Sequence, residues 1–320
     1  MLKTLGVLSN RQKTILVLCD KGKIGTLRQC EALAKPLEQH LNADAIYIDV
    51  NLPFWFKILT PFLTRHLPIR FLPTLSLNGQ PSLIVAAGRQ AYLLAAPLAK
   101  KIPTIALLKP RCSLDYFTIV IPPQHDEVGV HPNVIETLGS LHPHKEVSFA
   151  VNKKPDAYTI TILLGGNSKH YTFKETDFVE IAAYLKQKVR DKSNTNILIS
   201  PSRRTPTSGI DILKRELSNL DVTIWDGTGE NPYFNYIGSA DEILVTGDSI
   251  SMISEACYLG KPIEIWKLPI KNKRFSRFYK TIIQNQHAVF AKAPWPITFN
   301  PLRECERALP LIIKLIQKEN

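Results

Sequence analysis

The regular alternation of short apolar runs with amphipathic segments places the strongest constraint on how this 320-residue chain can fold. The runs form a first series, Thr14–Cys19, Ala45–Val50, Ser82–Ala86, Thr104–Leu108 and Phe117–Ile121, and a second series, Tyr158–Leu164, Asn196–Ser200, Val222–Trp225, Ile243–Thr246 and Pro262–Trp266. Strands that alternate with helices along a chain are typical of parallel sheets covered by helices on both faces. The sequence therefore predicts an α/β fold in which one alternation of strands and helices is repeated.

A polar segment that contains a proline, Val151–Asp156, separates the two series. The chain is longer than one compact domain usually is, and its 44% hydrophobic residues can supply two cores. We therefore expect two Rossmann-like domains with parallel sheets, residues 1–153 and 154–320. An amphipathic helix is predicted over Glu304–Gln317, and in two-domain proteins of this kind such a helix can cross back over the first domain.

The N-terminus and the cysteines bear on the compartment. Met1–Asp20 lacks the long apolar stretch and the cleavage site of a signal peptide, and no segment offers about twenty consecutive apolar residues. The five cysteines are scattered, without the CxxC spacing of metal or redox sites. We expect a cytoplasmic protein without a metal ion or a cofactor, and its oligomeric state is left open.

The net charge of +12 is unevenly distributed. No Asp or Glu occurs from Val50 through Leu114, or again from Ile265 through Arg303, and each stretch holds eight Lys and Arg. Two basic surfaces should result, and such surfaces attract nucleic acid, anionic lipid or phosphorylated small molecules. No RNA-binding or helix-turn-helix signature accompanies the charge, so we expect no nucleic-acid partner.

The segment Ala240–Pro262 is the most informative part of the second half. It reads as a strand, a tight turn and a helix that ends at Gly260, and it contributes five candidate ligand-binding residues: Gly247, Asp248, Ser249, Ser251 and Glu255. Backbone N–H groups and hydroxyls at the start of such a helix suit a diphosphate, and the carboxylate further along can accept two ribose hydroxyls. The alternatives are that Asp248 is a helix N-cap and that Glu255 is a solvated helix residue.

Three more loops follow predicted strands and add candidates. They are the glycine loop with Gly165, Gly166 and Asn167, the basic loop with Ser202, Arg203 and Arg204, and the loop Trp225–Tyr233 with Glu230 and Asn231. Glycines let the backbone approach a ligand closely, and paired arginines suit bidentate phosphate contacts, although a solvated basic turn is the alternative. Since parallel strands open at one edge of a sheet, all four loops should meet there.

These motifs resemble a known family. The resemblance is carried by Ser202–Pro206, Trp225–Tyr233, Val245–Glu255 and Gly260–Pro262 in the second half, and by Ala87–Arg89, Pro123–Asp126 and Asn133–Leu141 in the first. Together they are similar to the mitochondrial-fission ELM-like family, which comprises a plant mitochondrial division factor and many bacterial relatives. That family is similar in fold to GT-B glycosyltransferases. The resemblance implies a nucleoside-diphosphate sugar as donor substrate, bound in the interdomain cleft.

Catalysis would need a general base in the first domain. Sugar transfer with inversion requires a carboxylate or imidazole near the acceptor hydroxyl, because deprotonation accompanies attack at the anomeric carbon. Glycosyltransferases commonly offer a histidine in the first glycine loop, but Asp20–Thr26 has none, which leaves Asp20 as one candidate. His125 and Asp126, which follow a strand and two prolines, are the better pair, unless they only cap a turn.

The segment Asn51–Leu72 mixes five aromatic residues with Lys and Arg and has no acid. This composition suits an interfacial segment on an anionic membrane surface, and the alternative is an internal helical pair broken by proline. The leading hypothesis is a glycosyltransferase homologue that is peripheral on the cytosolic face of a membrane. The rival hypothesis is a non-catalytic scaffold that keeps the fold.

Overall fold

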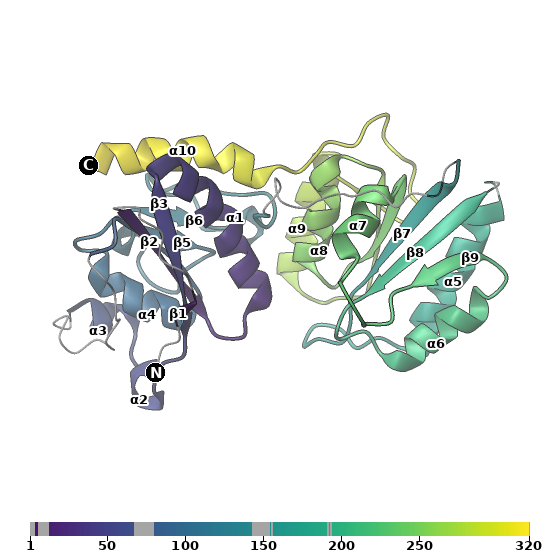
Figure 1. The fold of residues 1–320 in the computed structure, drawn as a ribbon, viewed down its shortest axis with the longest axis horizontal. Helices are drawn as coiled ribbons and strands as arrows, with labels where there is room; N and C mark the ends of the chain where they lie inside the picture. The colour runs from purple at the N-terminus through teal and green to yellow at the C-terminus, as the bar shows by residue number, and fades with distance from the viewer. Residues whose placement is uncertain are drawn as a thin grey trace. The chain divides into compact units, whose positions relative to one another are not determined.

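The computed structural model describes residues 4–5, 13–66, 80–142, 154, 156–190, 192 and 194–319 (Figure 1). The chain divides into two compact units, unit 1 with Met1–His144 and Arg303–Asn320, and unit 2 with Lys145–Leu302. Each unit holds a six-stranded sheet of its own. The predicted α/β fold with two Rossmann-like domains is therefore confirmed, while the predicted boundary after residue 153 falls beside residues 143–153, which lie outside the described residues.

The sheet of unit 1 has the strand order β1-β3-β2-β4-β5-β6. Its strands are β1 (Thr4–Leu5), β2 (Lys13–Asp20), β3 (Ala43–Val50), β4 (Leu83–Ala87), β5 (Thr104–Leu107) and β6 (Ile119–Ile121). All pairs are parallel except β1 with β3. Without the edge strand β1 the order is that of a doubly wound sheet, whose topological switch point lies between β2 and β4.

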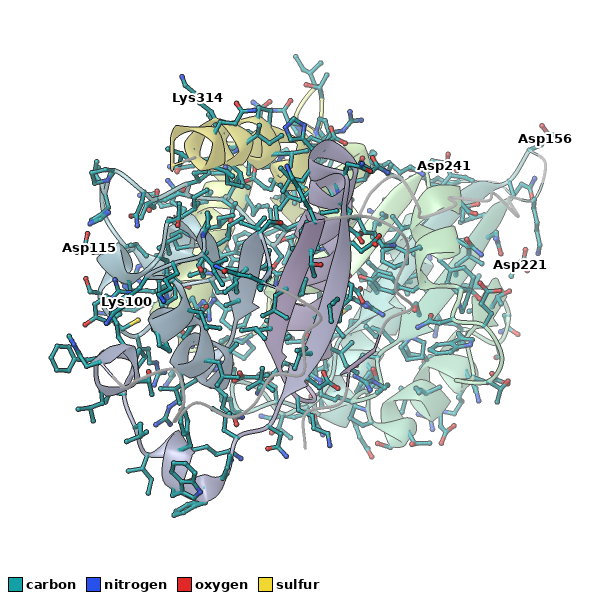
Figure 2. The ribbon with its side chains drawn as sticks, turned by 60° about the vertical axis from the view of Figure 1, so that its left-hand side comes forward. Lys100, Asp115, Asp156, Asp221, Asp241 and Lys314 are labelled. Atoms are coloured by element: carbon teal, nitrogen blue, oxygen red, sulfur yellow. The ribbon has the colours of Figure 1, made fainter. Side chains whose placement is uncertain are left out.

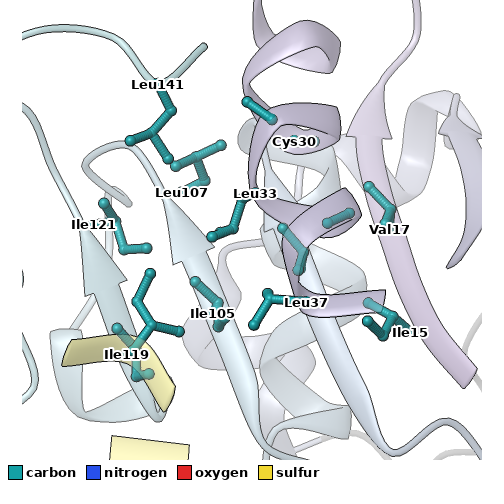
Figure 3. Packing of buried hydrophobic residues seen from close by; sticks show 14 of the residues in the cluster. Ile15, Val17, Cys30, Leu33, Leu37, Ile105, Leu107, Ile119, Ile121 and Leu141 are labelled. Atoms are coloured by element: carbon teal, nitrogen blue, oxygen red, sulfur yellow. The ribbon is translucent and has the colours of Figure 1, made fainter. Parts of the chain in front are cut away.

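The helices of unit 1 cover both faces of this sheet. They are α1 (Ile24–Leu41), α2 (Phe54–Lys57), α3 (Pro61–His66), α4 (Arg89–Leu98) and α10 (Glu304–Glu319), with 3-10 turns η2 (Leu114–Tyr116) and η3 (Gln124–Asp126). Leu33 and Leu37 of α1 pack with Ile105 and Ile119 on one face, as Figure 3 shows. The side chains of α4 fill the core on the other face.

The C-terminal helix α10 belongs to unit 1, as the sequence suggested. Ile312 and Ile316 are buried in the same core as the apolar side chains of α1, and Cys305 Sγ donates to Ala32 O at 3.1 Å. Lys314 projects from the exposed side of the helix (Figure 2). Glu304 accepts from the Leu138 N–H at 2.7 Å and pairs with Arg307 at 2.8 Å. The last helix therefore completes the fold of the first half of the chain.

The sheet of unit 2 is wholly parallel, in the order β12-β11-β10-β7-β8-β9. Its strands are β7 (Tyr158–Leu164), β8 (Thr195–Pro201), β9 (Asp221–Ile224), β10 (Glu242–Thr246), β11 (Ile263–Trp266) and β12 (Val289–Phe290). Counted from β7, this is the Rossmann order 3-2-1-4-5-6 read from one edge, with its switch point between β7 and β10. Ligands of such sheets bind at the carboxyl ends of the strands near that point.

The helices of unit 2 also lie on both faces (Figure 1). They are α5 (Glu175–Arg190), α6 (Thr207–Glu216), α7 (Tyr233–Ser239), α8 (Ile250–Ala256), which continues as the 3-10 turn η4 (Cys257–Leu259), and α9 (Lys273–Gln284). The sheet face under α5 and α6 carries the main apolar core, which includes Phe178, Leu185 and Leu244. Within the described ranges, no helix of either unit combines the length and apolar character needed to cross a bilayer.

A buried ionic cluster joins α5 to the sheet of unit 2. Lys188 forms ion pairs with Glu242 and with Glu264, the second at 2.9 Å, and both carboxylates are almost fully buried. Tyr184 Oη and Trp295 Nε1 donate to Glu264 at 2.6 and 2.8 Å. These ion pairs and hydrogen bonds replace the water that the charged groups of the cluster lose on burial.

Candidate functional site at the carboxyl edge of the second sheet

The four loops singled out in the sequence do open at one edge of the sheet. They follow β7, β8, β9 and β10, which are parallel neighbours in register: Leu163 pairs with Val245 and with Ser200, and Ile199 pairs with Ile224. Parallel strands of matched register end at the same level, so their loops are adjacent. The loops after β7 and β10 flank the topological switch point.

Asp248 ties the two loops of the switch point together. Its Oδ2 accepts from the Gly166 N–H at 3.0 Å and its Oδ1 accepts from Thr246 Oγ1 at 2.7 Å. The same threonine hydroxyl accepts from the Gly165 N–H at 2.7 Å. Burial raises the pKa of Asp248, and the hydrogen bonds from Thr246 and Gly166 offset only part of this. Asp248 therefore bridges two loops and does not cap the helix.

Ser249 is the N-cap of α8. Its Oγ accepts from the Met252 N–H at 3.3 Å, which leaves the hydroxyl hydrogen able to donate to a ligand. Ser251 lies two residues further along, in the first turn of α8, and is half-buried. The N-cap interpretation offered for Asp248 is thus wrong by one residue, because the carboxylate is turned toward the neighbouring strand's loop.

The glycines at this edge are required by close packing within the protein. A Cβ on Gly165 would overlap the Asp248 carboxylate, and a Cβ on Gly166 would overlap the backbone of Arg204. A Cβ on Gly247 would lie 2.6 Å from the hydroxyl of Tyr279, which donates to the Gly247 carbonyl. These positions hold three loops against one another, which is a separate role from the expected approach to phosphate.

The basic loop after β8 is bonded to the glycine loop. Asn167 N–H donates to Arg204 O at 3.0 Å, and Arg204 Nη1 donates to Asn167 O at 3.3 Å. Thr205 Oγ1 donates to Gly165 O at 2.5 Å, and Ser202 N–H donates to Thr205 Oγ1 at 2.9 Å. The side chains of Arg203 and Arg204 are exposed. The structure therefore presents two cations beside the switch point.

Glu255 is buried, with only 8% of its surface exposed. Tyr233, the first residue of α7, donates its hydroxyl to Glu255 Oε2 at 2.5 Å. The alternative of a solvated helix residue is therefore wrong. Lys261, in the loop that follows α8 and η4, binds the end of α7, because its ammonium donates to the carbonyls of Gly238 and Ala240, each at 2.6 Å. The loop after β9 and helix α8 form one bonded group.

The remaining candidates of unit 2 lie on the exposed loop between β9 and α7. Glu230 is exposed, and Asn231 Oδ1 accepts from the Tyr233 N–H at 3.0 Å. The sequence did not single out Thr246, Thr205, Tyr233, Lys261 or Tyr279. These residues form no recognisable sequence motif, because the groups that they bind lie on other elements of the fold. Among the residues with assigned positions, no group of three or more His, Cys, Asp and Glu could hold a metal ion.

In unit 1, Asp20 has a structural partner. Its Oδ1 accepts from the Ala91 N–H at 2.9 Å at the start of α4, and a Cβ on Gly88 would overlap its carboxylate. Gly88 has φ +116°, which favours glycine. Asp20 ends β2 and Gly88 follows β4, so this pair spans the switch point of unit 1 as Asp248 and Gly165 span that of unit 2.

His125 and Asp126 lie on η3, directly after β6. His125 is 2% exposed, and its Nε2 is 4.0 Å from Asp126 Oδ1. Lys109 Nζ donates to the Asp126 carbonyl at 3.0 Å. Two strands separate β2 from β6, which places Asp20 about 14 Å from this pair along the sheet edge. The structure does not bring the three catalytic candidates together.

Helices α2 and α3 present an exposed apolar surface. This α2–α3 surface comprises Phe54, Trp55, Ile58, Phe62 and Leu63, which are 80%, 62%, 65%, 57% and 50% exposed. Phe56 is fully buried below it, and Arg65 Nη1 donates to the Ala96 and Tyr116 carbonyls at 3.0 and 3.2 Å. The pair is thus fixed to unit 1 by one side and exposed on the other. Residues 67–72 of the predicted segment lie outside the described residues.

The family follows from comparison with known proteins. The family model described as "Mitochondrial fission ELM1" matches residues 24–315. The chain belongs to this family. An uncharacterised protein of Rickettsia prowazekii (strain Madrid E), RP120, is 25% identical over 93% of this chain and 97% of its own length. The mitochondrial fission protein ELM1 of Arabidopsis thaliana is also 25% identical, over 58% of this chain and 51% of its own length. The chain thus matches about half of that plant protein.

Solved structures agree on the fold. UDP-GlcNAc 2-epimerase from Methanocaldococcus jannaschii superposes with a TM-score of 0.53 at 14% identity, covering 95% of this chain and 100% of the epimerase. MurG from Acinetobacter baumannii gives 0.52 at 14% identity, covering 96% of this chain and 92% of MurG. This member of the ELM1 family therefore has a GT-B-like fold.

Proposed function

We propose that unit 2 binds a nucleoside-diphosphate sugar at the carboxyl edge of its sheet. The observation that carries this proposal is the buried carboxylate of Glu255, which already accepts one hydroxyl at the edge where ligands of Rossmann sheets bind. A carboxylate in this setting can accept ribose hydroxyls in the same way. In this proposal Ser249 and Ser251, with Arg203 and Arg204, bind the diphosphate.

The fold comparison supports the choice of ligand, since the M. jannaschii enzyme named above acts on UDP-GlcNAc, as its name states. The donor is a substrate, so the proposal needs no resident cofactor.

Thermal unfolding with UDP, UDP-GlcNAc and other nucleotide sugars tests the proposal. A ligand at a hundred times its Kd adds about 2.7 kcal/mol of stability, which corresponds to roughly 5–10 °C in Tm for a domain of this size. Glu255→Gln should remove the shift, whereas Glu180→Gln, at an exposed position of α5, should retain it. A wild-type protein that responds to no member of the panel would end the proposal.

We also propose that the α2–α3 surface docks on an anionic membrane, as a peripheral contact on the cytosolic face. Exposed aromatic residues beside cations suit the interface, where each basic group near the surface is worth about 1 kcal/mol. Lys57 lies on α2, and Arg89 Nη2 donates to the Lys57 carbonyl at 3.1 Å, so two cations lie beside the apolar residues. The five cysteines are free, which fits a reducing compartment.

Vesicle flotation tests the docking. Wild type should float with phosphatidylglycerol vesicles and less with phosphatidylcholine vesicles, and Phe54→Ser/Trp55→Ser should stay at the bottom. Val130→Ser is the matched control, because Val130 is an exposed apolar residue of unit 1 outside this surface. Equal recovery with neutral and anionic vesicles would count against the proposal.

Glycosyl transfer from the bound donor is the activity that the fold favours, with Asp126 as the candidate base, since its side chain is 14% exposed. A non-catalytic scaffold is the second candidate, and the burial of Asp20 and His125 favours it. A general base must reach the acceptor hydroxyl. Release of UDP from UDP-GlcNAc in the presence of membranes, matched by GlcNAc incorporated into the membrane fraction and abolished by Asp126→Asn, would establish transfer. Donor binding without UDP release in the presence of membranes would establish the scaffold.

A further inference from the structure

The hydroxyl of Tyr233 is hydrogen-bonded to the carboxylate of Glu255, which is the acceptor that the ribose of the proposed ligand would use. It donates to Glu255 Oε2 at 2.5 Å, a distance typical of a charge-assisted O–H donor. Glu255 is buried, so hydroxyl groups compete for few positions around its carboxylate. A ribose diol that binds Glu255 must share the carboxylate with Tyr233 or displace its hydroxyl.

Tyr233 ends a loop whose other hydrogen bonds are local. Trp225 Nε1 donates to Thr228 O at 2.9 Å, and Asp226 accepts from the N–H and hydroxyl of Thr228. In the described part of the chain, the hydrogen bonds of residues 226–231 stay within 225–233. The hydrogen bond from Tyr233 to Glu255 therefore ties the end of this loop to α8.

Two glycines give the loop freedom to change shape. Gly227 and Gly229 have φ +91° and +66°, and a Cβ on either would meet no atom within 4 Å. Glycine is favoured at these two positions by the positive φ and not by close packing. Residues 226–231 are all exposed. The loop can thus move without disturbing the core of unit 2.

We infer that Tyr233 is a specificity-determining latch, which yields one position on Glu255 to the 2′-hydroxyl of a ribose. This inference rests on the proposed function. When a ribonucleotide binds, its hydroxyl replaces that of Tyr233. When a 2′-deoxyribonucleotide binds, Tyr233 keeps its bond and Glu255 stays satisfied. The wild-type protein therefore distinguishes ribose from deoxyribose weakly, because Tyr233 supplies the hydroxyl that the deoxy ligand lacks.

Tyr233→Phe removes the competing hydroxyl and keeps the ring. A hydrogen bond to a buried charge is worth enough to change affinity about tenfold. We expect Y233F to bind UDP about tenfold more tightly than wild type and to prefer UDP over 2′-deoxyUDP about tenfold. The wild-type preference should be within about threefold.

The measurement is titration calorimetry of the full chain with UDP and 2′-deoxyUDP, and with the ADP and GDP pairs in parallel. Tyr236→Phe is the matched control: Tyr236 lies on the same helix, and its hydroxyl makes no hydrogen bond to any described residue. Y236F should behave as wild type. Tyr233→Leu provides a second variant without the hydroxyl if Y233F proves unstable.

The outcomes separate the latch from the site. If Glu255→Gln abolishes UDP binding but Y233F leaves both affinities unchanged or weakens both equally, the latch is overturned and the proposed function stands. If Glu255→Gln binds UDP as wild type does, the ribose site itself is overturned. If Y233F binds and wild type does not, the latch is supported in its strongest form. If neither binds any pair, both proposals fall.

Discussion

At the scale of single residues, the topological switch points of both units have the same pairing of an aspartate with a glycine. A buried aspartate from one strand end fills the space that a side chain would need on the neighbouring strand's loop. In unit 2 the pair is Asp248 and Gly165, and in unit 1 it is Asp20 and Gly88. Each carboxylate accepts a backbone N–H that the loop would otherwise bury without a partner.

Gly165→Ala should therefore destabilise the protein by about 1–3 kcal/mol, because the methyl group and the carboxylate cannot share one space. Gly25→Ala is the control: Gly25 lies in α1, where a Cβ would meet no atom within 4 Å, and it should be neutral or slightly stabilising. Urea denaturation measures both. Combining G165A with Asp248→Ser should restore part of the loss, and an equal effect of the two alanines would refute the overlap.

The raised pKa of Asp248 predicts a pH dependence. Because burial disfavours its charged form in the folded chain, the stability it confers is full below the unfolded-state pKa and is lost as pH rises through the folded-state pKa. Asp248→Asn, which stays neutral, should gain stability relative to wild type as pH rises from about 4, and the difference should then level off. Denaturation across a pH series checks this. If wild type instead became more stable relative to D248N as pH rises, the prediction would be wrong.

How far single residues could be predicted depends on where their partners lie. Ser249 and Glu255 were found because they belong to one local motif, a turn followed by a helix. Tyr233 was passed over, since its bond to Glu255 crosses between two helices that the sequence does not show as neighbours. The role of Asp248 was missed for the same reason: a turn aspartate can cap its own helix or bond the next strand's loop, and only the tertiary fold decides.

At the scale of elements, the ionic cluster on α5 shows that buried charges are stable only when each has partners of opposite charge or hydrogen bonds. Lys188 serves two carboxylates at once, and although burial lowers its pKa, the bonds to Glu242 and Glu264 raise it further than burial lowers it. Lysine side chains on one helix can thus have very different energetic roles.

Lys188→Met should cost about 3–5 kcal/mol, because it leaves two buried carboxylates without this cation. Lys186→Met on the same helix is the matched control. Lys186 pairs with Glu216 at 2.9 Å where both side chains are about one-third exposed or more, so its loss should cost at most about 1 kcal/mol. Guanidinium denaturation compares the two variants. Similar losses would mean that solvent reaches the Lys188 cluster.

Elements buried on both faces were predicted best. Central strands such as β2, β4 and β10 appear as apolar runs because parallel strands inside a sheet are covered on both sides, whereas the two-residue edge strands β1 and β12 were not predicted. Helix α9 was not predicted, although Phe275, Phe278, Tyr279 and Ile282 recur at helical spacing and are buried. Its solvent face is basic, and that charge was interpreted only as a surface. Helix α7 is short and contains Gly238, so it gave no periodic signal.

At the scale of the whole molecule, each unit has its own core, and the chain passes from one unit to the other twice. The sequence indicated two domains and a closing amphipathic helix. The sequence raised a return of that helix to the first domain without deciding it, because an apolar stripe specifies burial but not the partner that covers it. The assignment of α10 to unit 1 has a consequence for how the protein unfolds.

Ile312 is fully buried between α10 and the sheet of unit 1. Ile312→Ala should therefore destabilise unit 1 by about 2–5 kcal/mol through lost apolar contact and the cavity that remains. Since the two cores are separate, hydrogen exchange should accelerate in β2, β4 and α1, which are distant from α10 in sequence, and stay unchanged in β7, β8 and β10, which precede it more closely. Ile253→Ala, at a fully buried position of α8, should give the opposite pattern. Faster exchange in both units from either variant would show that the two cores unfold together.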